Sequence, residues 1–145
     1  MVSKQPRRKP REGVDSDGRT PLHYAAGDSK PDEVARLLAA GVAVNVQDDN
    51  GWSALHFAAQ AESPECAAEL LRAGADHSLQ DSFGNTALFR AVFSSRGEGS
   101  VIRLLRQAGA DPLVKNKHGV SPVSLARTIA SYNVAQFFSD IGDVQ

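Results

Sequence analysis

The chain has 145 residues, of which 41% are apolar, 6% aromatic and 23% charged, and these are ordinary figures for a globular protein. No apolar run approaches the roughly 18 residues that a membrane-spanning helix needs, so we do not expect the chain to be an integral membrane protein. The first ten residues lack an apolar core, so we expect no secretory signal peptide. The single cysteine, Cys66, excludes an internal disulfide framework and fits a reducing compartment, so we expect a cytoplasmic location.

The net charge of −1 is unevenly distributed along the chain. Residues 1–13 carry five basic groups and one acidic group, which gives 5 − 1 = +4, whereas the remainder carries 11 basic and 16 acidic groups, which gives 11 − 16 = −5. We expect residues 1–13 to be a disordered basic tail. Such a Lys/Arg/Pro cluster is also typical of a nuclear import signal or a phosphate-binding arm. The acidic remainder argues against nucleic acid as the main partner.

A ten-residue segment recurs four times, at residues 17–26, 50–59, 83–92 and 118–127. Its glycine falls at positions 18, 51, 84 and 119, so the spacings are 51 − 18 = 33, 84 − 51 = 33 and 119 − 84 = 35. A second segment, Leu-Leu followed by small residues and glycine, keeps step with the first, and its fourth copy is degenerate. Internal periods of this length indicate a repeat architecture. We divide the domain of residues 14–145 into repeats at about 14–48, 49–81, 82–116 and 117–145.

Each unit predicts a turn followed by two helices. The Asp/Asn-rich stretch that ends in glycine is a turn, because glycine adopts positive φ and short polar side chains bond the local backbone. A hydroxyl residue then caps the first helix, namely Thr20, Ser53, Thr86 or Ser121. The second helix carries an apolar stripe and ends at a glycine. One such helix pair cannot bury its apolar face alone, so the units must stack into an all-α solenoid.

The opening Gly-x-Thr-Pro-Leu-His-x-Ala-Ala and the closing Leu-Leu-x-Ala-Gly-Ala-Asp resemble the ankyrin repeat over roughly residues 14–142. The resemblance implies an ankyrin-repeat solenoid of four helix-turn-helix repeats joined by β-turn loops. It also implies that the repeat histidines, here His23 and His56, hydrogen-bond the backbone of the neighbouring turn. In its fourth repeat the chain is similar to small bacterial ankyrin proteins.

Three departures from the pattern stand out. In the third repeat Phe89 replaces the histidine, and Arg90 occupies a position where Tyr24, Phe57 and Leu125 stand in the other repeats. A buried unpaired arginine would be costly, so Arg90 must either extend outward or pair with an acidic neighbour. The third repeat is also two residues longer around residues 93–100. We place this extra length at the end of its second helix, as an enlarged flexible loop. That loop is either a tolerated surface insertion or a contact with a partner.

The fourth repeat has the composition of a terminal cap, with polar residues interleaved along it. We expect Phe137, Phe138 and Ile141 to pack back on the third repeat.

Signals for catalysis are weak. The four histidines do not pair at helical spacing, so we expect no metal site. The carboxylates of Asp48, Asp49 and Asp81 fall at turn positions, where turn formation explains them better than acid–base chemistry. Cys66 is better explained as a packed side chain than as a nucleophile, and no phosphate-binding glycine loop is present. We predict a non-enzyme without a cofactor or a small-molecule substrate.

The resemblance implies a protein-binding scaffold whose contacts lie on a concave face, beside the turn glycines and just after the Ala-Ala pairs. Large aromatic residues on such turns are common interface anchors, although Trp52 and Phe83 could equally serve to cover the adjoining turn. Carried onto this sequence, the partner-binding positions are Arg19, Asp28, Gln47, Asp49, Asn50, Trp52, Gln60, Ser82, Phe83, Asn85, Phe93, Ser94, Arg96, Lys117 and His118.

These observations favour a stoichiometric module that binds, and inhibits or sequesters, a protein partner. The most specific version is an immunity protein that neutralises a bacterial toxin, since some bacterial ankyrin proteins have that role. The alternative is a nuclear or transcriptional adaptor that uses the basic tail for import. An enzyme or a small-ligand protein is the third class.

Overall fold

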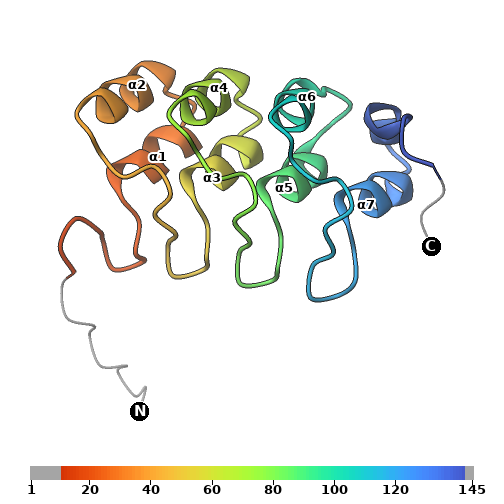
Figure 1. The fold of residues 1–145 in the computed structure, drawn as a ribbon, viewed down its shortest axis with the longest axis horizontal. Helices are drawn as coiled ribbons and strands as arrows, with labels where there is room; N and C mark the ends of the chain where they lie inside the picture. Colours follow the sequence, from red (N-terminus) through yellow and green to blue (C-terminus); the bar gives the residue numbers. More distant parts are fainter. Residues whose placement is uncertain (1–10, 143–145) are drawn as a thin grey trace, which may run out of the picture.

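The computed structural model describes residues 11–142 and arranges them as a row of stacked helix pairs (Figure 1). Helices α1, α3, α5 and α7 form one layer, α2, α4 and α6 form a second, and the turns between repeats project as long fingers (Figure 1). No β-strand occurs in the described residues, so the predicted all-α solenoid is confirmed. The helices are α1 Pro21–Gly27, α2 Pro31–Ala39, α3 Ala54–Gln60, α4 Pro64–Arg72, α5 Ala87–Ser94, α6 Ser100–Gln107 and α7 Pro122–Thr128, followed by the 3₁₀ turn η1 Val134–Phe138.

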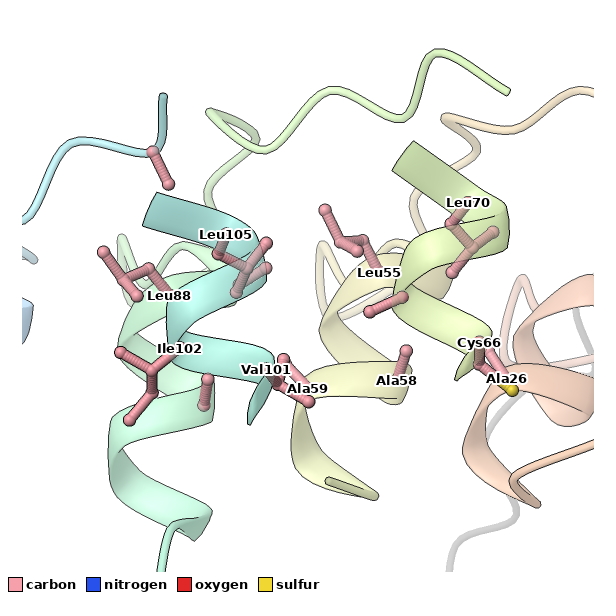
Figure 2. Close-up of a cluster of buried hydrophobic side chains, with 14 of the residues drawn as sticks. Ala26, Leu55, Ala58, Ala59, Cys66, Leu70, Leu88, Val101, Ile102 and Leu105 are labelled. Carbon is pink, nitrogen blue, oxygen red and sulfur yellow. The ribbon is translucent and has the colours of Figure 1, made fainter. Parts of the chain in front are cut away.

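The hydrophobic core runs the length of the row, between the two helix layers. Each first helix buries an aliphatic residue near its start, and each Ala-Ala pair lets neighbouring first helices pack closely, α1 on α3 and α3 on α5. Figure 2 shows the core around Leu55 and Leu70 in one repeat and around Leu88, Ile102 and Leu105 in the next. These five side chains are at most 1% exposed. The core is therefore shared between repeats rather than built within one.

Each finger turn is closed by one acidic or amide side chain. The Oδ1 atom of Asp48 accepts hydrogen bonds from the backbone N–H groups of Asn50 at 2.9 Å and Trp52 at 2.8 Å. Asp15, Asp81 and Asn116 do the same in the other fingers. Adjacent fingers are joined through the backbone, as where the N–H of Ser82 donates to the carbonyl of Asn50 at 2.9 Å. The turn interpretation of the repeated carboxylates is thus confirmed for Asp48 and Asp81.

Two buried histidines connect consecutive repeats. The Nδ1 atom of His56 accepts the backbone N–H of Ser53 at 3.2 Å, so the proton lies on Nε2, which donates to the carbonyl of Asn85 at 2.9 Å. His23 makes the equivalent bond to the carbonyl of Trp52 at 2.9 Å. The structural role predicted for both histidines is confirmed. In the third repeat the apolar Phe89 is buried at this position.

The extra residues of the third repeat lie between α5 and α6, at residues 95–99, where the earlier repeats use only residues 28–30 and 61–63. Our placement at the end of the second helix is therefore wrong. The loop is closed locally, because the Ser95 hydroxyl donates to the Glu98 carbonyl at 2.8 Å and accepts the N–H of Gly97 at 3.2 Å. Ser95 is buried, so the insertion is anchored at its start.

The fourth repeat ends in a 3₁₀ turn instead of the second α-helix that four equal repeats require. Its packing on the third repeat is as expected. Phe138 is only 1% exposed, and the Arg106 guanidinium donates to the carbonyl of Phe137 at 2.9 Å and to Asp140 at 2.6 Å. A side chain at Gly99 would collide with the Phe137 ring. The short turn therefore closes the solenoid at this end.

The finger glycines provide a matched test of repeat stacking. Gly51 and Gly119 have φ values of +80° and +77°, but a Cβ at Gly51 would lie 2.8 Å from the Cα of Asp81, whereas one at Gly119 meets nothing within 4 Å. Gly119→Ala should cost about 1–2 kcal/mol from backbone conformation alone. Gly51→Ala should cost clearly more in urea unfolding, because it also pushes two fingers apart. Equal losses would contradict the close approach of the fingers.

Acid should weaken the fold before the carboxylates titrate. Burial lowers the pKa of His23 and His56 below the ordinary value of 6.5. The unfolded chain therefore takes up protons that the folded chain excludes, and the unfolding free energy should fall as the pH drops below about 6.5. Urea titrations between about pH 7 and pH 5 measure this slope. A His23→Gln/His56→Gln variant should have a flatter slope, and an unchanged slope would contradict the assignment.

Candidate functional site

The finger turns and the first helices (α1, α3, α5 and α7) together form one side of the solenoid, which we call the concave face. Two neighbouring depressions lie on this face. The finger pocket, of about 380 Å³, is lined by residues that include Arg19, Asn50, Trp52, Phe57, Phe83 and Arg90. The helix-end groove, of about 670 Å³, is lined by residues that include Phe93, Ser94, Arg96, Leu125, Ile129 and Tyr132. Gln60, at the end of α3, belongs to both, so the two depressions are adjacent.

Aromatic rings and guanidinium groups form a continuous series of contacts across this face. The Arg19 guanidinium lies 5.3 Å from the Phe57 ring centre, and the Phe57 ring meets Trp52 edge-on at 5.0 Å. The Arg90 guanidinium lies 4.7 Å from the Trp52 ring centre and 5.1 Å from that of Phe93. We call these five residues the aromatic–arginine row. Such stacking holds long side chains in one conformation and so preorganises the surface.

The two arginines of the row differ in how well they are paired. Arg19 donates from Nε to Oδ2 of Asp48 at 3.2 Å, within hydrogen-bond distance. Arg90 has its nearest carboxylate oxygen, Oδ2 of Asp81, at 3.9 Å from Nη2. Within the described residues, Nε of Arg90 and Oδ2 of Asp81 are buried without a hydrogen-bond partner.

Burial lowers the pKa of Arg90, and the charge of Asp81 partly offsets that effect. The Arg90 side chain is 15% exposed and that of Asp81 is not exposed at all. Of our two alternatives for Arg90, pairing with an acidic neighbour is the one found, as a loose ion pair with Asp81. Its guanidinium stacks on the rings of Trp52 and Phe93 and does not extend outward into solvent. An imperfectly paired charge of this kind lowers stability, which makes it a candidate for function.

The concave face brings together many of the positions that the sequence predicts for partner contact. Eight of them line the two depressions, namely Arg19, Asn50, Trp52, Gln60, Phe83, Phe93, Ser94 and Arg96. Phe83 and Phe93 are 59% and 62% exposed, which is unusual for large apolar side chains. Asp28, Ser82, Lys117 and His118 are exposed but line neither depression.

Trp52 packs within the chain, which fits a covering role, and its role as an interface anchor stays a prediction. Its ring packs on Phe57 and Arg90, and it is neither fully buried nor exposed.

Three other predicted contact positions have structural roles. Asn85 is 6% exposed, its carbonyl accepts from His56, and its side-chain oxygen accepts from Asn116 at 2.9 Å, so the expectation that it meets a partner is wrong. The Gln47 amide bridges two fingers by donating to the carbonyls of Gly51 at 3.0 Å and Gln80 at 3.1 Å.

Asp49 pairs within the chain. Both of its carboxylate oxygens accept from the Arg11 guanidinium, at 2.8 and 3.1 Å. Arg11 belongs to the segment that we predict to be a disordered tail, and its pairing ties the end of that segment to a finger. Residues 1–10 of the predicted tail lie outside the described residues.

Sequence reasoning missed several residues of this face. Phe57, Leu125, Ile129 and Tyr132 line the depressions but are not among the predicted contacts. Phe57, Arg90 and Leu125 occupy one repeat position, so the departure at Arg90 was the available signal. Tyr132 follows the end of α7, the first helix of the fourth repeat. The repeat pattern has already decayed there, so no sequence signal marks Tyr132.

Other site chemistries find little support in the described part of the chain. Residues 11–142 contain no group of three or more side chains suited to hold a metal ion. Cys66 is buried, and burial raises the pKa of its thiol, which opposes formation of a nucleophilic thiolate. None of the helices in this range is long and apolar enough to span a membrane.

Comparison with known families identifies the repeat. A family model described as ankyrin repeats (3 copies) matches residues 27–116, which is more than half of the chain. The match begins at the end of α1 and ends at Asn116, the residue that closes the fourth finger turn, so it covers one copy fewer than the sequence predicts. The repeat outside the match is the one whose second helix is reduced to a 3₁₀ turn. A search of curated proteins finds no match.

The loose pairing of Arg90 leads to a stability prediction. Leucine occupies the equivalent position, Leu125, in the fourth repeat. Replacing a whole buried ion pair by uncharged residues is often neutral or stabilising, whereas removing one partner leaves the other charge uncompensated. The double variant Asp81→Asn/Arg90→Leu copies Asn116 and Leu125 of the fourth repeat, so it should leave the unfolding free energy unchanged or raise it by up to about 1 kcal/mol. Thermal and urea unfolding measure this change. A loss of more than about 2 kcal/mol would show that the pair of Arg90 and Asp81 is retained for stability.

Proposed function

The chain belongs to the ankyrin-repeat family, and from that premise we propose that it binds a partner protein through its concave face. Ankyrin repeats are in general protein–protein interaction modules without catalytic activity. The observation that carries the proposal is the pair of exposed rings, Phe93 at one end of the aromatic–arginine row and Phe83 in the finger pocket that Trp52 and Arg90 also line. Interfaces are enriched in aromatic and arginine anchors of this kind.

The energetics of the face support a preformed binding surface. Trp52 and Arg90 are held by stacking, so their ordering costs are met before a partner arrives. The two outer rings still expose more than half of their surface. Covering them removes apolar area from water, which favours association. A rigid centre flanked by exposed apolar groups therefore fits a hot spot.

We further propose that binding inhibits or sequesters the partner, because occlusion of a partner's surface needs no chemistry from the chain. The narrowest version is neutralisation of a bacterial toxin, which predicts a toxin or an enzyme as the captured protein. The alternative, a nuclear adaptor, depends on the basic tail, tested through residues 1–12. It predicts that deletion of those residues abolishes nuclear accumulation.

The test is affinity capture from native cells, with the full chain as bait. A Phe83→Ala/Phe93→Ala double variant should lose a stoichiometric protein, with affinity reduced by about 2 kcal/mol or more if the rings are anchors. Its melting temperature should stay close to that of the parent chain, because both rings are exposed. Calorimetry on the purified complex measures the loss.

The matched control is Val42→Ala. Val42 is also an exposed apolar residue, at 38%, but it lies on the end of the solenoid by the first repeat, outside both depressions. Capture should be retained with this variant. Equal capture by the double variant and the parent chain would refute the concave face as the binding surface. A captured enzyme that stays fully active in the complex would refute inhibition while leaving binding intact.

A further inference from the structure

The charge of the array changes sign along its length. Residues 14–81, the first two repeats, contain 4 basic and 12 acidic side chains, which gives 4 − 12 = −8. Residues 82–142 contain 7 basic and 3 acidic side chains, which gives 7 − 3 = +4. The row of repeats places these two parts side by side along one axis (Figure 1). The two halves of the array therefore differ in the sign of their net charge.

On the concave face the positive half is poorly neutralised. Arg90 has only the 3.9 Å contact to Asp81, and Arg96 forms no ion pair within the described residues. Lys117 lies on the finger next to Phe83, because its backbone N–H donates to the Phe83 carbonyl at 3.0 Å. By contrast, Arg19 in the acidic half is paired with Asp48. Arg96 and Lys117 are exposed cations without an ion pair within the described residues, and Arg90 is only loosely paired, so this half has positive charge to offer a ligand.

Apolar groups lie beside these cations. The helix-end groove is lined by Phe93, Leu125, Ile129 and Tyr132 together with Arg96. Its acidic lining residue, Glu62, comes from the second repeat, on the side of the acidic half. The groove therefore combines apolar side chains with the positive charge of Arg96, and its part from the fourth repeat carries no acidic side chain.

We propose that the concave face of the third and fourth repeats binds an acidic segment of the partner protein that also carries apolar side chains. This inference rests on the proposed function and names the chemistry of the partner. The apolar side chains of the segment pack in the helix-end groove, and its carboxylates face Arg90, Arg96 and Lys117. The negative first two repeats repel the same segment, so charge and the apolar groove together fix its position along the array.

The test uses two blocked synthetic peptides with the same apolar residues, one with interspersed Asp and Glu and one with Asn and Gln in their place. Trp52 is the only tryptophan and lies in the finger pocket, so its fluorescence reports binding to the full chain. The acidic peptide should bind at least about tenfold more tightly than the amide peptide. Its affinity should fall as the salt concentration rises.

Two charge-matched variants separate a local effect from net charge. Arg96→Gln/Lys117→Gln removes two exposed cations from the proposed surface and should weaken the acidic peptide by about tenfold or more. Arg36→Gln/Arg72→Gln removes two exposed cations from α2 and α4, where each pairs with a glutamate of its own helix, and should leave affinity unchanged. Both variants should melt like the parent chain.

Three outcomes would overturn the inference: equal binding of the two peptides, equal weakening by the two variants, or no binding of the acidic peptide at millimolar concentration. The captured partner distinguishes this failure from failure of the proposed function. One result separates the two: the captured partner no longer binds the Phe83→Ala/Phe93→Ala variant but still binds the Arg96→Gln/Lys117→Gln variant. The concave face is then the binding surface and its preference for acidic segments is refuted.

Discussion

The register between neighbouring repeats depends on a few hydrogen bonds that connect a helix of one repeat to the turn of the next. His56 donates to the carbonyl of Asn85, and the finger backbones bond directly to one another. Because the histidine is buried, it must be neutral and correctly oriented to make this bond. The register in turn aligns the Ala-Ala pairs and closes the shared core. The aromatic–arginine row requires the same alignment, since its members come from three successive repeats.

Periodicity predicted most of the fold, because each feature of the repeat has a local cause. A glycine with positive φ, an aspartate that closes its turn and a hydroxyl that caps a helix act within a few residues, so the sequence reveals them. Exceptions arose where the pattern decays. The inserted residues of the third repeat fall before α6 because the Ser95 hydroxyl closes a loop there. The last helix became a 3₁₀ turn that Arg106 holds in place.

The candidate site was less accessible to sequence reasoning. Family resemblance identified the finger and helix-end positions, but it could not tell an exposed side chain from one used within the fold. Asn85 is one such case, because its buried amide completes a contact with Asn116 that only the three-dimensional arrangement creates. Arg90 shows the opposite: it broke the repeat pattern in the sequence, and the structure places it at the centre of the concave face, between Trp52 and Phe93. A departure from an otherwise regular repeat thus marks a position, here Arg90, where the fold itself does not require a charged side chain.

The central claim is that the partner covers the concave face at the aromatic–arginine row. Hydrogen exchange of the chain, free and in complex with its captured partner, tests it most directly. The account predicts slower exchange in the complex at the second and third fingers and at residues 93–97, with α2, α4 and α6 unchanged. Protection confined to α2, α4 and α6 would place the partner on the opposite layer of helices and contradict the account.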